Sequence, residues 1–166
     1  MKKIIVTFIC FIGALAINAQ TVSDRDKKFV DCALHDGMME VKLGELAQSN
    51  ASSAEVKNLG KHMIDDHTKA GNELKAMAER KRLPVPSALT EKQQKAYDKL
   101  AQKKGTDFDK AYSHCMVKDH KKAICKFKKE AKKGDDSELK TWADKIVPTL
   151  EHHKHMSEQT CKDVRK

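Results

Sequence analysis

Two short segments of the sequence repeat the same residue types at the same spacing. Both read Met-x-x-Asp-His, once in "HMIDDH" at 62–67 and again in "HCMVKDH" at 114–120. Thioether, carboxylate and imidazole groups are all ligands of transition metals in proteins, and thioethers favour soft Cu(I). The repeat therefore has two interpretations. Either His67 and His120 meet in the core and hold an ion, or the match is an accident of helix packing.

The elements that must position these residues are helices. Strand signals are almost absent, and proline occurs only at 84, 86 and 148. Pro148 removes a backbone donor inside the last helix and is expected to kink it. Four long helices and one short helix between the second and third predict an all-α four-helix bundle. Capping residues and helix breakers place these five helices at about 24–49, 52–82, 91–103, 107–133 and 136–162. For the second of them, Ser52 and Glu55 are expected to form a capping box.

In three of the long helices a histidine replaces an apolar residue on the buried stripe. His67, His120 and His153 each continue a run of apolar side chains spaced three or four residues apart. At a rise of about 1.5 Å per residue in an up-down-up-down bundle, they lie roughly 23, 20 and 15 Å from the end where the first helix begins. Glu40 of the first helix lies at roughly 23 Å by the same count. Four polar side chains from four helices are thus expected to be neighbours near the bundle axis.

These four side chains form the predicted metal site. Imidazole and carboxylate ligands suit copper, zinc or iron, and the interior of a helical bundle is a common place for such a site. Asp66 and Asp119 each precede a histidine and point to another face, where they are expected to act as capping residues or to accept hydrogen bonds around the site. Met63 and Met116 lie one turn before the histidines, either as thioethers near the ion or as ordinary packing residues. A metal-free hydrogen-bond network of the same groups accounts for the pattern almost as well.

Other kinds of chemistry find little support in the sequence. There is no Cys-x-x-Cys-His, which argues against covalent haem, and no nucleotide cofactor is expected. There is no Glu-x-x-His, so di-iron ferroxidase chemistry is disfavoured. No serine elbow occurs, and only the crowded Cys115 has a possible base on its own helix face. A binding protein is therefore favoured over an enzyme, with a metal-dependent oxidoreductase as the third interpretation.

The start of the chain predicts export. The basic "MKK", the apolar "IIVTFICFIGALAI" and the small-residue "NAQ" are typical of a Sec signal peptide over 1–19, which leaves 20–166 as a single domain. Loss of Lys2 and Lys3 lowers the formal net charge from +9 to +7. The mature chain is expected in the periplasm or outside the cell. There a basic surface can meet anionic polymers or lipid head groups, whereas nucleic acid is not an expected partner.

The mature chain contains four cysteines, an even number that suggests disulfides in an oxidising compartment. Cys115 and Cys125 lie about 15 Å apart along one helix and cannot bond to each other. Cys32 in the early first helix and Cys161 in the late last helix fall near the same end of an up-down-up-down bundle. They are therefore the preferred disulfide pair.

Three longer stretches carry a further pattern: "EVKLGELAQSNASSAEVKNLGKHMIDDHTKAGNELKAMA", "FDKAYSHCMVKDHKKA" and "DDSELKTWADKIVPTLEHH". Over about 29–156 they resemble the bacterial family called domain of unknown function 4142. The resemblance implies a ferritin-like helical bundle that is exported, is often labelled a membrane or outer-membrane protein, and has no settled activity. The four cysteines are not part of the family pattern. Carried over by position, the family motif falls on Glu40, Met63, Asp66, His67, Phe108, Asp109, Tyr112, Asp119, His120, Pro148 and His153.

Two functional hypotheses follow. The first is an exported, non-enzymatic bundle that binds one transition metal ion and serves metal handling or envelope stress. The second is a metal-free structural or interaction protein of the cell envelope. In both, Asp66, Asp119, Met63, Met116 and Tyr112 are the side chains expected to surround the central histidines.

Overall fold

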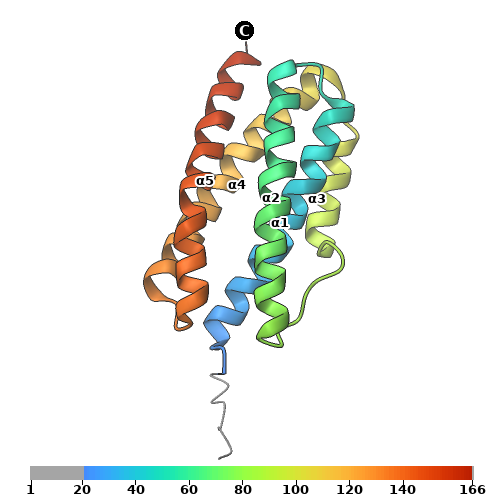
Figure 1. The fold of residues 1–166 in the computed structure, drawn as a ribbon. Coiled ribbons are helices and arrows are strands. Elements are labelled where there is room, and N and C mark those ends of the chain that lie inside the picture. The colour runs from blue at the N-terminus through green and yellow to red at the C-terminus, as the bar shows by residue number, and fades with distance from the viewer. Residues whose placement is uncertain (1–20, 166) are drawn as a thin grey trace, which may run out of the picture.

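The computed structural model describes residues 21–165, which contain five α-helices and no strand (Figure 1). The predicted four-helix bundle with one extra short helix is confirmed. None of these helices combines the length and the apolar character needed to span a membrane. The predicted signal peptide over 1–19 lies outside the described residues. The helices are α1 (Asp24–Asn50), α2 (Ala54–Arg80), α3 (Glu91–Ala101), α4 (Gly105–Lys133) and α5 (Ser137–Asp163).

Side-chain caps define where four of the helices begin. Each capping oxygen accepts a hydrogen bond from a backbone N–H of the first turn, as expected for serine, threonine and aspartate. These caps are Ser23, Ser53, Thr90 and Asp136. The cap of α2 is thus Ser53 and not the predicted Ser52, because the Ser52 hydroxyl donates to the carboxylate of Asp109 instead. α5 continues as one helix through Pro148.

The directions of the helices differ from the up-down-up-down order assumed from the sequence. α3 runs back along the bundle, so α4 starts beside the end of α1, and α2 and α4 run the same way (Figure 1). At one end, the buried Asp26 carboxylate accepts hydrogen bonds from the backbone N–H groups of Asp135 and Asp136, at 3.1 and 2.8 Å. The start of α5 is thereby fixed against the start of α1.

This topology overturns the predicted Cys32–Cys161 disulfide. Cys32 lies near the start of α1 and Cys161 near the end of α5, so the two cysteines are at opposite ends of the bundle. All four cysteines of the described chain are free. The prediction was wrong because it assumed that the last helix ends where the first begins. The reversal through α3 places these two ends far apart.

The hydrophobic core consists of two clusters, one in each half of the bundle. The lower cluster in Figure 1 contains Phe29, Phe127 and Trp142, whose ring centroids are 5.1 to 6.3 Å apart. The upper cluster includes Phe108 and Tyr112, stacked at 5.5 Å. Between the residues of the two clusters lie His67 in α2, His120 in α4 and the buried His153 in α5. A polar layer therefore divides the core at mid-height.

Candidate metal centre

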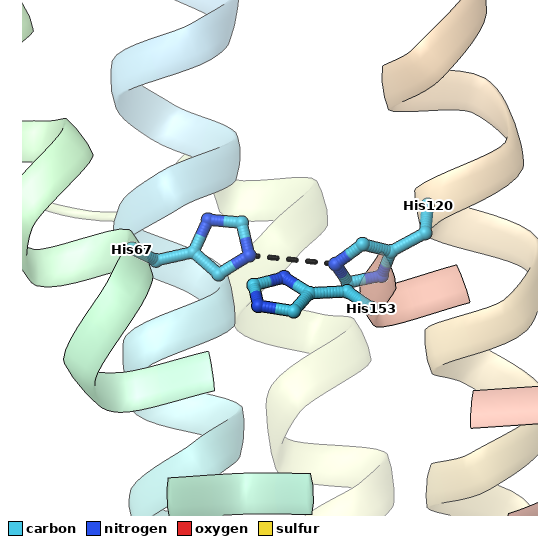
Figure 2. A group of neighbouring side chains, drawn as sticks. All are labelled: His67, His120 and His153. Carbon is cyan, nitrogen blue, oxygen red and sulfur yellow. Dashed lines mark hydrogen bonds between the residues drawn. The ribbon is translucent and has the colours of Figure 1, made fainter. Parts of the chain in front are cut away.

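Three histidines from three helices meet in this polar layer. His67 of α2, His120 of α4 and His153 of α5 each offer one ring nitrogen, and these nitrogens lie within 4.8 Å of one another. The ring centroids are 5.3 to 5.6 Å apart. Figure 2 shows the three rings turned toward one another across the interior. The structure thus brings together the three histidines whose proximity the apolar stripes predicted, and we call them the histidine triad.

In the observed topology the three histidines lie closer to one height along the bundle than in the up-down-up-down order expected from the sequence. α5 ascends from the end where α1 begins, so at about 1.5 Å per residue His153 lies at roughly 24 Å rather than 15 Å. His67 and His120, both counted from the lower ends of their helices, lie at roughly 20 Å. The three side chains therefore converge at one level because each helix contributes its middle turn.

Two of the three imidazoles are held by a hydrogen bond on the side away from the centre. His120 Nδ1 lies 2.9 Å from the carbonyl oxygen of Met116 and donates to it, which leaves Nε2 with a free lone pair. His153 Nε2 lies 2.8 Å from the carboxylate of Asp66 and donates to it. His153 Nδ1 is then a buried acceptor without a hydrogen-bond partner. These outer bonds leave one lone pair of His120 and one of His153 free to face the triad.

The separation of two ring nitrogens matches that of ligands on one ion. His67 Nε2 and His120 Nε2 are 3.4 Å apart, which is long for a hydrogen bond between ring nitrogens. With metal–nitrogen bonds of about 2.0–2.1 Å and angles between tetrahedral and trigonal, two ligands of one ion lie roughly 3.3–3.6 Å apart. The pair is therefore already spaced as ligands of a common metal.

Electrostatics keeps the triad in the neutral form that binds metal. Burial lowers the pKa of His67 well below its usual value, and repulsion from charged forms of His120 and His153 lowers it further. Burial also lowers the pKa of His120 to about 4. The pKa of His153 is lowered by burial despite the opposing influence of Asp66. Because ligating imidazoles must be unprotonated, all three rings are ready to bind at neutral pH.

The two aspartates that precede triad histidines have different partners. Asp66 lies where expected, because it accepts a hydrogen bond from a triad ring, that of His153. Asp119 instead accepts from the thiol of Cys115 at 3.1 Å and from the ammonium of Lys122 at 3.3 Å. Only the first aspartate therefore acts directly on the orientation of a candidate ligand.

Glu40, the predicted fourth ligand, does not join the triad. The close group of possible ligands in the described residues contains the three histidines alone. Glu40 is buried, its Oε2 lacks a hydrogen-bond partner, and burial together with the charges of Asp119 and Asp36 raises the pKa of its carboxyl well above the usual value. The height of Glu40 along α1 follows from the helical rise, but its side-chain direction does not. The charge of Glu40 acts on Tyr112 and Cys115, one to two turns before His120 in α4, so the carboxyl group lies beside α4 and not among the triad nitrogens.

The remaining predicted neighbours lie in the upper cluster. Tyr112 is fully buried, its hydroxyl has no hydrogen-bond partner among the described residues, and burial followed by the charge of Glu40 raises its pKa. Met63 and Met116 are also fully buried. Since α2 and α4 run in the same direction, both thioethers lie one helical turn away on the same side of the triad. That turn places them within the cluster that covers the triad from above.

Comparisons with known proteins give a family and a fold. The sequence matches the family described as Domain of unknown function (DUF4142) over residues 14–160. No curated protein matches the chain. Among solved structures, a DUF305 fragment from Deinococcus radiodurans is similar with a TM-score of 0.75 and 13% identity, covering 86% of this chain and 98% of that chain.

CopM is a second structural neighbour. Its Cu(I)-bound form is similar with a TM-score of 0.70 and 19% identity, covering 83% of this chain and 96% of that one. A silver-bound form has a TM-score of 0.68 and 20% identity, covering 83% and 95%. At such identities these likenesses show a common fold.

Proposed function

The chain belongs to the DUF4142 family, and we propose that it is a copper-binding bundle in which His67, His120 and His153 hold a single ion. One observation carries the proposal: three imidazoles from three helices each bring one ring nitrogen to within 4.8 Å of the others inside the bundle. Each ring is supplied by a different helix, so an ion bound there also links α2, α4 and α5. Binding and stability of the fold are thereby coupled.

An ion accounts for the triad better than a hydrogen-bond network does. Buried polar atoms in native proteins nearly always have a partner. In the described residues, His153 Nδ1 has none, and the contact between His67 and His120 is long. A single cation at the centre would satisfy one lone pair of each ring at once. Without it, the one remaining ring proton, that of His67, can be donated to His120 Nε2 or to His153 Nδ1 but not to both.

Copper is the ion that these donors favour. Imidazole suits copper, zinc and iron, and among divalent first-row ions copper binds nitrogen sites most strongly. Thioethers one turn from the triad, those of Met63 and Met116, favour the monovalent form. The copper-bound forms of CopM, which shares the fold, support this choice.

The role that we propose is copper buffering or sensing outside the cytoplasm. The apolar segment at the start of the sequence supports export as a periplasmic or secreted protein, in contact with the outer membrane or another anionic surface. In this role the chain's own residues bind, orient and shield the ion. His67 is the one triad member that is partly exposed, which gives the ion access from the α2 side.

A metal-free structural protein is the second candidate, and one observation favours it. The bonds from His153 to Asp66 and between His67 and His120 already connect three helices without any ion. Under this hypothesis the triad is a polar lock in the core. It predicts destabilised histidine variants and no effect of metal on the melting temperature.

Elemental analysis of the chain over 20–166, purified without a histidine tag and exposed to copper, zinc or iron, separates these candidates. We expect the copper content to fall by about one equivalent in His67→Ala and in His120→Ala, because each removes one of three ligands. His155→Ala, an exposed histidine of α5, is the matched control and should retain all the metal. Equal metal content in all four proteins would overturn the copper site, and preferential retention of zinc or iron would change the metal assigned to it.

A further inference from the structure

We propose that Cys161 and His114 form a second metal site, one for monovalent copper, at the upper end of the bundle. Cys161 lies in the last turns of α5 and His114 in the first half of α4, and the Sγ atom is 3.6 Å from the ring Nδ1. The thiol is largely buried, with 8% of the residue exposed, whereas the imidazole is exposed. The site uses no residue of the triad, so it is independent of the function proposed above.

The distance between the two donors fits a shared ion. Metal–sulfur and metal–nitrogen bonds of about 2.3 and 2.0–2.1 Å at a tetrahedral angle place the two donor atoms roughly 3.6 Å apart. The observed separation has the same value. Two ligands alone take a wider, near-linear angle, at which the same bonds place the donor atoms roughly 4.3 Å apart, so binding also requires the exposed ring of His114 to move outward by about 0.7 Å. The two helices are also tied together nearby by the ion pair of Lys121 and Glu158, whose charged atoms are 3.7 Å apart.

The number and type of donors select the ion. Structural zinc takes four ligands, and within the described residues no third histidine, cysteine or carboxylate forms a close group with this pair. Monovalent copper is stable with two ligands, and a soft thiolate is its preferred donor. On binding, the S–H bond breaks, a sulfur–copper bond forms and the proton leaves to solvent. No electron is transferred, because copper arrives already as Cu(I).

The two cysteines of α4 lack this arrangement. The thiol of Cys115 donates to Asp119, and burial raises its pKa, so it resists forming the thiolate. Cys125 is exposed and has no histidine contact in the part of the chain that the structure describes. Of these three thiols, Cys161 alone lies within hydrogen-bond distance of an imidazole nitrogen, so only there are a sulfur and a nitrogen donor already side by side.

Anaerobic titration of the reduced chain with Cu(I), against a coloured Cu(I) chelator, tests the proposal. Binding by a thiolate gives a near-ultraviolet charge-transfer band that imidazole ligands alone do not give. We expect this band to saturate at about one equivalent in the wild type, to vanish in Cys161→Ser, and to require at least about tenfold more free Cu(I) in His114→Gln. Because His114 is exposed, its variant is expected to fold normally, which the helical circular dichroism signal will verify.

Two controls make the result specific. Cys125→Ser should leave the band unchanged, because it removes an exposed thiol of α4 that makes no hydrogen bond to an imidazole among the described residues. The double variant His67→Ala/His120→Ala should also keep the band, since it disables only the triad. A wild-type chain without the band, or a band that survives Cys161→Ser, would overturn the second site and leave the triad untouched.

Discussion

The segment from Met63 to His67 in α2 presents its carboxylate to another helix, whereas the segment from Met116 to His120 in α4 keeps its carboxylate within its own helix. Asp66 accepts from His153 of α5. Asp119 accepts from Cys115 and Lys122, one turn before and one turn after it in α4. Identical spacing therefore gives each copy the same positions on its helix, while the neighbouring helices decide what each position does.

The two Met-x-x-Asp-His segments also run in the same direction along the bundle. Because α3 returns the chain along the bundle, α2 and α4 run parallel, and in both the methionine lies one turn on the same side of its histidine. In an up-down-up-down bundle the two thioethers would have flanked the triad from opposite sides. The repeat is thus consistent with a layered site in which histidines form one level and methionines the next.

The largest difference between the copies is expected in stability. His120 is only 1% exposed and donates to the Met116 carbonyl, whereas His67 is partly exposed. In the metal-free protein we expect His120→Ala to lower the free energy of unfolding by about 2–4 kcal/mol, through a cavity and a lost hydrogen bond. His67→Ala should cost less than about 2 kcal/mol. Urea denaturation with a chelator present measures both, and equal losses would contradict the asymmetry.

The two aspartates offer a sharper test of copper binding. Outer partners of histidine ligands typically contribute about 10–100-fold to metal affinity. Asp66→Asn should weaken copper binding by about that factor, since it disturbs the bond that aims His153 Nδ1. Asp119→Asn changes the same residue type at the matching position and should alter the affinity by less than about threefold, because it bonds to no triad ring. Competition with a chelator of known affinity measures the two, and a reversed order would refute the assigned roles.

Acidification tests the contribution of the buried imidazole of His120 to stability. Because the folded-state pKa of His120 is lowered from 6.5 to about 4, the unfolded chain binds protons more readily between these values. The stability of the metal-free protein should therefore be complete above about pH 6.5 and should decline as the pH falls toward 4. Thermal unfolding across this range measures the decline, which His120→Gln is expected to reduce. The same slope in wild type and variant would place the relevant proton elsewhere.

Glu130, in the lower half of the bundle, is expected to act in the opposite direction. Burial and the negative charge of Asp26 raise its pKa from 4.5 to about 7. Its contribution to stability is therefore present below about pH 4.5 and is lost as the pH rises through 7. Glu130→Gln, which stays neutral, should flatten this loss in the same thermal unfolding series. An unchanged profile would show that the carboxyl group is ionised without cost.

The helices and the height of the triad could be predicted from the sequence because both depend on local rules. Capping residues such as Thr90 and breakers such as Gly134 act on their own helix, and the distance of a histidine from a helix end follows from the helical rise. The direction of a helix depends instead on how a connection returns, and eleven residues in α3 were enough to reverse it. Cys32 and Cys161 were paired wrongly for that reason.

Rotation about a helix axis was the second quantity that local rules did not supply. Glu40 lies at the predicted height and outside the triad, because the height follows from the rise of α1, whereas the direction of the side chain depends on the helices that pack against α1. The proximity of His114 and Cys161 could not be predicted from the sequence for the same reason. The two residues belong to different helices and share no sequence pattern, and only the packing of α4 on α5 brings them together.

The smallest expected effect distinguishes the two methionines. Met63→Leu and Met116→Leu conserve volume in a buried cluster, so each should change the free energy of unfolding by less than about 1.5 kcal/mol. If thioethers contribute to the ion, both variants should weaken binding of Cu(I) and leave binding of Cu(II) unchanged, since only the soft form prefers sulfur. Because the parallel helices place both sulfur atoms on one side of the triad, the two losses should be similar. A loss in one variant alone would show that a single thioether completes the site, and no loss in either would assign both methionines to packing.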